Sequence, residues 1–327
     1  MGLFLVILQN FNAGSRVILK HNTFFMKIVF MGTPDFAVAS LDAIVQANFD
    51  VVAVVTAPDK PAGRGQKLNE SAVKKYAVEK GIPVLQPEKL KNPEFIEELR
   101  SYQADLQVVV AFRMLPEIVW NMPAKGTINL HGSLLPQYRG AAPINHAIIN
   151  GEKESGVTTF FLKQEIDTGD IILSDSVPIA DDETAGDLHD KLMVVGANLL
   201  VKTLHAVEAN NITEQPQPQN DDLKHAPKIF KEDCKIDWNN PAQTIHNLIR
   251  GLSPYPTAFT ILNDKNLKVF KAEIEDKEPG IVAGGFLTDG KTYLKFAAKD
   301  GFIKLLDIQY EGKKRMLIED FLRGMRL

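Results

Sequence analysis

Two kinds of pattern alternate along the chain from Met26 to about Asn210: short apolar runs, and longer segments whose apolar positions have helical spacing. Several runs are continuously apolar, which is typical of strands buried on both faces of a parallel sheet. The predicted strands are 27–31, 49–56, 82–85, 106–112, 127–131 and 157–162. The predicted helices are 35–47, 69–80, 115–121, 142–150 and 184–209. This βαβ order predicts an α/β domain with a Rossmann-like, mostly parallel sheet.

The pattern changes after residue 212. Segment 213–225 is polar and carries prolines, so it predicts an interdomain linker that is locally stiff. The segments that follow are a helix at 242–251, strands at 258–262, 267–274, 292–297 and 302–309, and a closing helix at 317–322. Short strands at this spacing predict a small OB-like β-barrel. We therefore expect a catalytic domain over 26–212 and a barrel domain over 226–327.

The first 25 residues differ in pattern from the rest. Their apolar run, 3–8, is too short for a signal-peptide core, and no positively charged segment precedes it. Met26 opens the first predicted strand. We therefore expect translation to start at Met26, and residues 1–25 to be an upstream extension without function.

Composition narrows the class of protein. Cys234 is the single cysteine of the 327 residues, so an internal disulfide is excluded and a reducing compartment such as the cytoplasm fits. The seven histidines lack paired-ligand spacing, so we expect no metal. No apolar run approaches the length of a membrane span. The net charge is −4, but the chain from Ala226 onward has 17 Lys+Arg and 14 Asp+Glu, which either reflects chance or favours a polyanionic partner.

Candidate chemistry is concentrated in the segment that starts at Asn129. Side chains alternate along a strand, so Asn129 and His131 share one face, and Gly132 then ends the strand. Substrates of open parallel sheets bind at the ends of such strands. Downstream, Asp167 supplies a carboxylate in an Asp-Thr-Gly turn. An amide, an imidazole and a carboxylate suit acid–base and oxyanion chemistry at a carbonyl. A structural histidine and a simple turn aspartate are the alternatives, and the sequence does not show that the two side chains meet.

A long loop is predicted at 58–67, with Arg64 between two glycines and with Lys60 and Lys67 near it. One interpretation is a mobile, solvated loop. The other is a basic finger that becomes ordered on a phosphate-bearing partner. The residues themselves favour neither interpretation.

Four motifs together resemble a known family. They are Phe-Met-Gly-Thr-Pro-Asp-Phe-Ala from residue 30, Pro-Asp-Lys-Pro-Ala-Gly-Arg-Gly from 58, Asn-Leu-His-Gly-Ser-Leu-Leu-Pro from 129, and Asp-Thr-Gly-Asp from 167. The chain from Met26 onward is similar to the formyltetrahydrofolate-dependent formyltransferases. Its Gly-Arg loop and its C-terminal barrel resemble the members that act on initiator methionyl-tRNA.

This resemblance implies roles for individual residues. Asn129, His131 and Asp167 would be catalytic. The segment Ser133, Leu134, Leu135 and Pro136 would contact the folate. Arg64, with Lys60 and Lys67, would engage the tRNA. The co-substrate would be 10-formyltetrahydrofolate, with no metal, in a monomeric enzyme of the bacterial cytoplasm that needs no membrane.

Three alternatives remain. A formyltransferase acting on an amino-sugar nucleotide would share the two-part layout. A nicotinamide-dependent oxidoreductase could use a Rossmann-like sheet, but Gly32-Thr-Pro-Asp35 is not the GxGxxG fingerprint. A non-catalytic RNA-binding module is disfavoured because Asn129, His131 and Asp167 are all present.

Overall fold

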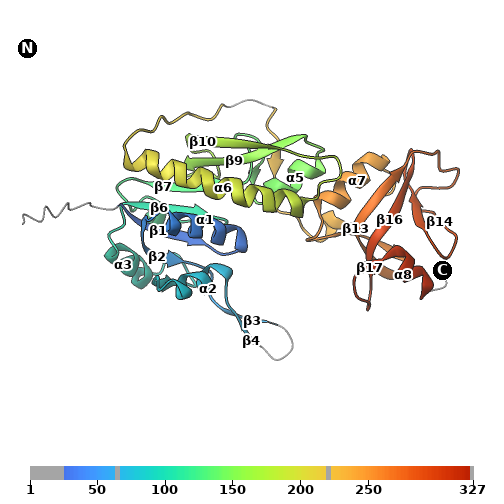
Figure 1. Ribbon diagram of the computed structural model, residues 1–327, viewed down its shortest axis with the longest axis horizontal. Helices are drawn as coiled ribbons and strands as arrows, with labels where there is room; N and C mark the ends of the chain where they lie inside the picture. Colours follow the sequence, from blue (N-terminus) through green and yellow to red (C-terminus); the bar gives the residue numbers. More distant parts are fainter. Residues whose placement is uncertain (1–25, 63–66, 219–221, 325–327) are drawn as a thin grey trace, which may run out of the picture.

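The computed structural model describes residues 26–62, 67–218 and 222–324 of the chain, and Figure 1 shows two units side by side. The N-terminal unit is a sheet with helices on both faces, and the C-terminal unit is a smaller antiparallel sheet with two helices. In the described ranges, no helix is both long and apolar enough to cross a membrane.

The central sheet has seven strands in the order β10-β9-β7-β6-β1-β2-β5. Their bounds are β1 Lys27–Gly32, β2 Asp50–Val55, β5 Val84–Leu85, β6 Leu106–Val110, β7 Thr127–His131, β9 Glu154–Phe161 and β10 Ile171–Pro178. The pairs from β5 to β7 are parallel, whereas β9 is antiparallel to both β7 and β10. The prediction of a Rossmann-like, mostly parallel sheet is therefore confirmed.

Helices cover both faces of this sheet. Helices α1 (Asp35–Gln46), α2 (Ala72–Glu79), α5 (Pro143–Ile149) and α6 (Ala185–Glu208) contribute to one apolar core. Helices α3 (Pro93–Ser101) and α4 (Glu117–Trp120) contribute to a second core on the other face.

Strand β1 shows why the apolar runs are continuous. Ile28 and Phe30 belong to the first core, whereas Val29 and Met31 belong to the second. All four are fully buried. Burial of each such side chain contributes about 1.5–3 kcal/mol, so both faces of the strand stabilise the fold.

Helix α6 begins where its sequence predicts. The Thr184 hydroxyl accepts a hydrogen bond from the Asp187 N–H at 3.2 Å, and the Asp187 carboxylate accepts one from the Thr184 N–H at 2.9 Å. This capping box satisfies two backbone donors at the helix start. The start of α6 is consequently well fixed, next to the C-terminal unit.

Several elements were not predicted, among them a hairpin, strand β10 and helix α3. The expected long loop at 58–67 contains a hairpin of β3 (Lys60–Ala62) and β4 (Lys67–Asn69), whose strands are too short for alternation to reveal. Strand β10 is at the edge of the sheet and its burial is irregular, so its apolar signal is weak. Helix α3 was missed although Asn92 caps it and Pro93 starts it.

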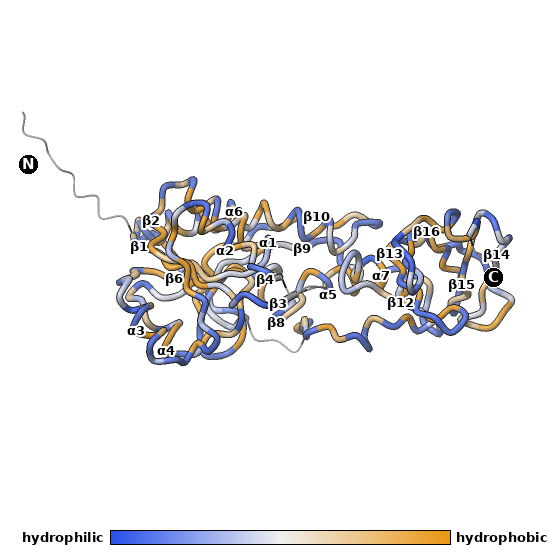
Figure 2. The backbone as a smooth tube through the Cα atoms, turned by 90° about the horizontal axis from the view of Figure 1, so that it is seen from below, coloured by the Kyte–Doolittle hydropathy of each residue, from blue (hydrophilic) through white to orange (hydrophobic). Residues whose placement is uncertain are grey.

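The C-terminal unit has its own core, and Figure 2 shows apolar positions in both units. Its elements are η1 Glu232–Cys234, α7 Ala242–Gly251, β12 Ala258–Leu262, β13 Lys265–Glu275, β14 Phe286–Thr288, β15 Leu294–Ala297, β16 Phe302–Tyr310, β17 Met316–Leu317 and α8 Ile318–Arg323. The sheet, in the order β12-β13-β16-β15-β14, curls into a half-barrel. Inside it the Trp238 ring stacks on Phe296, with ring centroids 4.7 Å apart.

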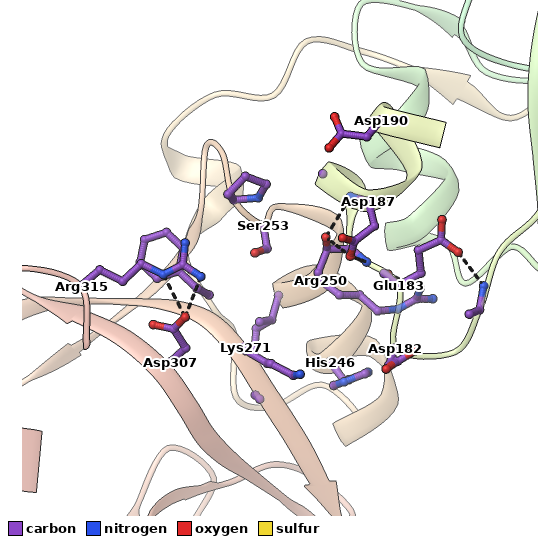
Figure 3. A pocket seen from close by; sticks show the side chains of 17 residues that line it. Asp182, Glu183, Asp187, Asp190, His246, Arg250, Ser253, Lys271, Asp307 and Arg315 are labelled. Carbon is purple, nitrogen blue, oxygen red and sulfur yellow. Dashed lines mark hydrogen bonds and ion pairs between the residues drawn. The ribbon is translucent and has the colours of Figure 1, made fainter. Parts of the chain in front are cut away.

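The two units meet where the start of α6 faces the end of α7 (Figure 3). Arg250 is 5% exposed, and its guanidinium donates a hydrogen bond to the Glu183 carbonyl at 3.0 Å. The Gly186 N–H donates to the Ser253 carbonyl at 3.0 Å. A cavity of about 600 Å³ lies between these segments.

The segment between the units also lies along the N-terminal unit. Strand β11 (His225–Ala226) pairs in parallel with β8 (Arg139–Gly140), which follows the predicted catalytic strand. The backbone that enters the C-terminal unit is therefore hydrogen-bonded next to the candidate site.

Candidate active site

The cavity beside His131 has a volume of about 670 Å³ and lies at the carboxyl ends of β1, β6 and β7. Between β1 and β6 the strand order reverses, and ligands of open α/β sheets bind at such a point. Its lining includes Pro34 and Phe36 after β1, Ala111–Leu115 after β6, Asn129–Gly132 at β7, Gly140–Asn145, and Lys163–Asp167.

Strand β7 carries two of the predicted catalytic residues to this cavity. It lies between β6 and β9, with Asn129 opposite Val109 and His131 opposite Thr158. Both side chains line the cavity, as their alternation along the strand requires. Asn129 is partly exposed, and none of the described residues forms a hydrogen bond with its side-chain amide. That amide is thus available to a substrate.

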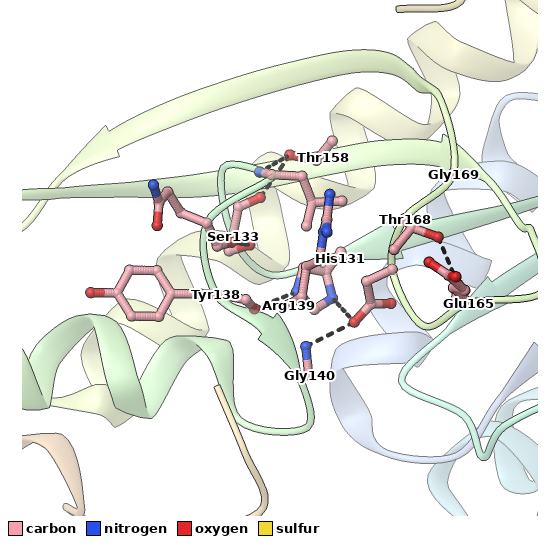
Figure 4. A network of polar contacts seen from close by, with 12 residues as sticks. His131, Ser133, Tyr138, Arg139, Gly140, Thr158, Glu165, Thr168 and Gly169 are labelled. Carbon is pink, nitrogen blue, oxygen red and sulfur yellow. Dashed lines mark hydrogen bonds and ion pairs between the residues drawn. The ribbon is translucent and has the colours of Figure 1, made fainter. Parts of the chain in front are cut away.

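The His131 ring is held from behind by a backbone carbonyl. Its Nε2 lies 2.9 Å from the Tyr138 carbonyl oxygen (Figure 4). Because a carbonyl only accepts, Nε2 carries the hydrogen. Its Nδ1 lies 3.8 Å from Oδ2 of Asp167. In the neutral ring the lone pair is therefore on Nδ1, the nitrogen nearer to the carboxylate.

Asp167 is fixed by its backbone and by a glycine. Its φ of 55° is in the left-handed region, which few side chains other than Asn and Asp adopt easily. Its Oδ2 accepts a hydrogen bond from the Gly140 N–H at 2.9 Å. Gly140 itself has φ 127°, and a Cβ there would lie 2.3 Å from the Ala226 oxygen, so no other residue fits. The structure thus brings together Asp167 and His131, which the sequence could not show.

Residues Ser133, Leu134, Leu135 and Pro136 form the turn after β7 and do not line the cavity. The Ser133 hydroxyl donates to the Gln137 carbonyl at 2.6 Å. The buried Thr158 hydroxyl donates to the Ser133 carbonyl at 2.7 Å and accepts from the Leu135 N–H at 3.1 Å. These bonds fix the turn that leads to Tyr138. Contact between this segment and folate stays a prediction.

Sequence reasoning missed the segment Ala111–Leu115, which lines the cavity directly after β6. Ala111 has φ 47°, and the Arg113 guanidinium donates to the carbonyls of Glu88 and Pro87. A signal was present, because polar and aromatic residues directly follow a buried parallel strand. Strained backbone at Ala111, Tyr138 and Asp167 also marks the site, since such residues cluster at functional sites.

Among the predicted tRNA contacts, Lys60 is exposed on β3 and does not line this cavity. Lys67 lies on β4, and Arg64 is outside the described residues. Across the described part of the chain, no group of three His, Cys, Asp or Glu residues could hold a metal ion.

Comparison with known proteins places both units of the chain in one family. Residues 26–204 match the family described as "Formyl transferase", and residues 228–326 match "Formyl transferase, C-terminal domain". Methionyl-tRNA formyltransferase of Bacteroides fragilis is 52% identical over 92% of this chain and 96% of its own length. The enzyme of that name from Phocaeicola vulgatus is 56% identical over the same shares of both chains.

A solved structure has the same fold. The N-formyltransferase from Helicobacter canadensis, in complex with folinic acid and dTDP-3-aminofucose, has a TM-score of 0.64 and 24% identity, and the match covers 86% of this chain and 98% of that one. At this identity the likeness shows the fold alone. Since both halves match and the identity to relatives extends over nearly the whole length, the chain belongs to the formyl transferase family.

Proposed function

We propose that this chain transfers the formyl group of 10-formyltetrahydrofolate to the free amino group of initiator methionyl-tRNA. The observation that carries the proposal is the 52% identity, over 92% of the chain, to a protein named methionyl-tRNA formyltransferase. The geometry supports it, because Asn129, His131 and Asp167 meet at one cavity. The product would serve translation initiation.

The residues of the cavity fit a folate. Its lining combines apolar side chains, among them Phe112, Leu115 and Ile144, with the polar groups of the site. Binding sites for small molecules typically have such a mostly apolar wall with a few placed polar groups. We propose that Ala111–Leu115 forms part of the folate wall and that Ser133–Pro136, in the turn after β7, contacts the folate.

The bound folate supplies an activated formyl group. In the reaction, a bond forms between the amine nitrogen and the formyl carbon, and the bond from that carbon to the folate nitrogen breaks. The amine loses one proton and the folate nitrogen gains one. The chain must therefore stabilise a negative oxygen and move one proton, and it needs no covalent nucleophile.

Asn129 and His131 are the groups placed for these tasks. The free Asn129 amide can donate a hydrogen bond to the developing oxyanion, and a protonated His131 can donate from Nδ1. Nδ1 is also the nitrogen that can accept the proton of the amine and return it to the leaving nitrogen, since Nε2 is occupied by the Tyr138 carbonyl.

Asp167 is proposed to stabilise the charge of the protonated His131 ring. At 3.8 Å from Nδ1, its carboxylate is beyond a good hydrogen bond but close enough for a strong electrostatic effect at a site this buried. The ring's orientation is held by Tyr138 instead. Asp167 therefore acts on His131 chiefly through charge.

Two parts of the chain are proposed to bind the tRNA. The hairpin with Lys60, Arg64 and Lys67 would engage the acceptor end, and the C-terminal unit would contact the backbone. Arg315 is ion-paired with Asp307 at 2.6 Å, and its guanidinium carbon lies 4.1 Å from the centroid of the Phe270 ring. Arg323 is paired with Asp320. We therefore assign phosphate contact to the exposed Lys313 and Lys314, which form no ion pair with any described residue.

We further infer a catalytic domain over 26–212, a linker over 213–225 and a tRNA-binding domain over 226–327. Residues 1–25 lie outside the described residues and are proposed to be dispensable. The relatives are bacterial proteins, which supports a role in the cytoplasm of a bacterium. We propose that one copy of the chain suffices for activity.

Formyl transfer by the purified chain tests this function. Charged initiator methionyl-tRNA, a dTDP-amino sugar and glycinamide ribonucleotide are compared as acceptors, each with 10-formyltetrahydrofolate. We expect turnover with the tRNA far above that with either small acceptor. Preference for the amino-sugar nucleotide would overturn the proposal and make the chain a sugar formyltransferase.

A further inference from the structure

In the segment between the two units, the side chain of Gln217 contacts the turn that carries Asp167. Gln217 is 9% exposed although it belongs to a polar, proline-bearing stretch of the chain, and its neighbours Gln215 and Pro216 are exposed. A buried amide in an otherwise exposed segment needs partners, because an unpaired one costs about 1–3 kcal/mol.

Both the nitrogen and the oxygen of the Gln217 side-chain amide form hydrogen bonds. Its Nε2 donates to the Asp167 carbonyl at 2.8 Å and to the Gly169 carbonyl at 2.7 Å. Its Oε1 accepts from Nε of Arg139 at 3.0 Å and from Nη2 at 2.6 Å. Carbonyls only accept and a guanidinium only donates, so the partners fix the orientation of the amide.

These hydrogen bonds hold residues next to both His131 and Asp167. Asp167 is in the strained left-handed conformation, and Gln217 holds its carbonyl and that of Gly169, two residues on. Arg139 lies between Tyr138, whose carbonyl holds His131, and Gly140, whose N–H holds the Asp167 carboxylate. One side chain therefore connects the turn that carries Asp167 to the segment Tyr138–Gly140, whose first residue orients His131.

The remaining contacts of the same segment explain why Gln217 is well placed. The Tyr138 N–H donates to the Lys224 carbonyl at 2.6 Å, and the Ala141 N–H donates to the Ala226 carbonyl at 2.7 Å. The Ile171 N–H donates to the Gln215 carbonyl at 2.8 Å. Gln217 is thus anchored by backbone bonds on each side.

We propose that Gln217 is a positioning residue for formyl transfer: by joining the Asp167 turn to Arg139, it sets the position of the Asp167 carboxylate relative to His131. Gln217 does not line the cavity, so it acts through these neighbours and not on the substrate. The kinetic part of the inference rests on the proposed function.

The test compares Gln217→Glu and Gln217→Met with matched changes at Gln215. Glutamate keeps the acceptor for Arg139 but sets a carboxylate against two carbonyls, and methionine keeps the length without any hydrogen bond. Gln215→Glu and Gln215→Met make the same chemical changes at an exposed side chain of the same segment. We expect both Gln217 variants to lower kcat about 10²-fold, as small misplacement of a catalytic group does, with KM for folate and tRNA unchanged.

A spectroscopic measurement separates positioning from a general loss of stability. In the chain with ¹⁵N-labelled histidine, the His131 ring resonances and their pH titration should change in both Gln217 variants and in neither Gln215 variant. Full kcat together with an unchanged His131 titration in folded Gln217 variants would overturn the inference. So would a kcat loss that only follows the melting temperature. If the intact chain transfers no formyl group, the proposed function fails, whereas the His131 titration still tests the role of Gln217.

Discussion

Oδ2 of Asp167 lies 3.8 Å from Nδ1 of His131, while the other ring nitrogen, Nε2, lies 2.9 Å from the Tyr138 carbonyl. The backbone thus holds the ring, and the carboxylate faces the nitrogen that can gain a proton. The Tyr138 carbonyl thus orients the His131 ring, whereas the Asp167 carboxylate can stabilise its positive charge. A substitution at Asp167 can consequently remove the charge and leave the ring in place.

Asp167→Asn should give a folded chain with strongly reduced kcat. Asparagine tolerates the φ of 55°, and its carbonyl oxygen can still accept from the Gly140 N–H. What is lost is the negative charge near the protonated His131 ring. Steady-state kinetics as a function of pH, together with a melting curve, check this. An unchanged pH profile with retained activity would make Asp167 a turn residue only.

His131→Ala and Asn129→Ala should each lower kcat by about 10²–10³-fold, the typical cost of one oxyanion donor, and leave folate affinity nearly intact. Both side chains line the cavity and both face the reacting group in the proposed mechanism. Turnover and folate binding are measured on each variant. His205→Ala and Asn211→Ala, at exposed positions, are the controls. Near-normal turnover in either test variant removes that residue from the mechanism.

The sequence predicted strand β7 because its side chains have distinct environments. The strand has the predicted bounds, Thr127–His131. Because side chains alternate along a strand, the sequence also predicted that Asn129 and His131 share one face while Leu130 lies on the other. Thr184, a residue type that favours the start of a helix, likewise predicted where α6 begins. Local chemistry determines both features, so one sequence was enough.

The contacts that complete the site are not local. Gln217 belongs to a polar segment whose composition predicts a linker. Only in the folded chain does its amide bond to the carbonyls of Asp167 and Gly169. The Tyr138 carbonyl is a backbone group, and no residue type signals that it will hold His131. The periodicity of apolar residues likewise does not predict which distant segments pair, such as β8 with β11.

A chain that starts at Met26 should match the full chain in melting temperature and turnover. Met26 is 5% exposed and packs in the first core, and the Lys27 N–H donates to the Asp105 carboxylate at 2.8 Å. Met26 and Lys27 thus already belong to the folded N-terminal unit. Thermal unfolding and formyl transfer are measured on both chains. A clear loss of either in the shorter chain would assign residues 1–25 a structural or binding role.

Arg250→Ala should loosen the contact between the two units. The buried Arg250 guanidinium donates to the Glu183 carbonyl and, through Nε, to the Asn247 side chain at 3.0 Å. Removing it takes the donor from the Glu183 carbonyl, and an unpaired buried acceptor costs about 1–3 kcal/mol, whereas the Asn247 oxygen still accepts from Gln243 at 3.0 Å. We expect a lower melting temperature and faster proteolysis between the units. Lys228→Ala, at an exposed position, is the control, and equal stability of the two variants would show that Arg250 does not hold the units together.

The two proposed tRNA sites should respond differently to mutation. The double variant Lys313→Ala, Lys314→Ala removes two exposed charges, so tRNA affinity should fall and the salt dependence should become shallower by about two units of slope, one for each phosphate contact. Arg64→Ala should instead lower turnover at saturating tRNA, because its proposed task is to place the acceptor end. Affinity across a salt series and saturated turnover are measured on both variants. The control is Lys89→Ala, Lys91→Ala, which removes the same charge from exposed positions of the N-terminal unit. If the Lys313 and Lys314 variant has the slope of this control, those lysines do not contact phosphate, since a non-contacting charge alters the salt dependence far less than a released counterion does.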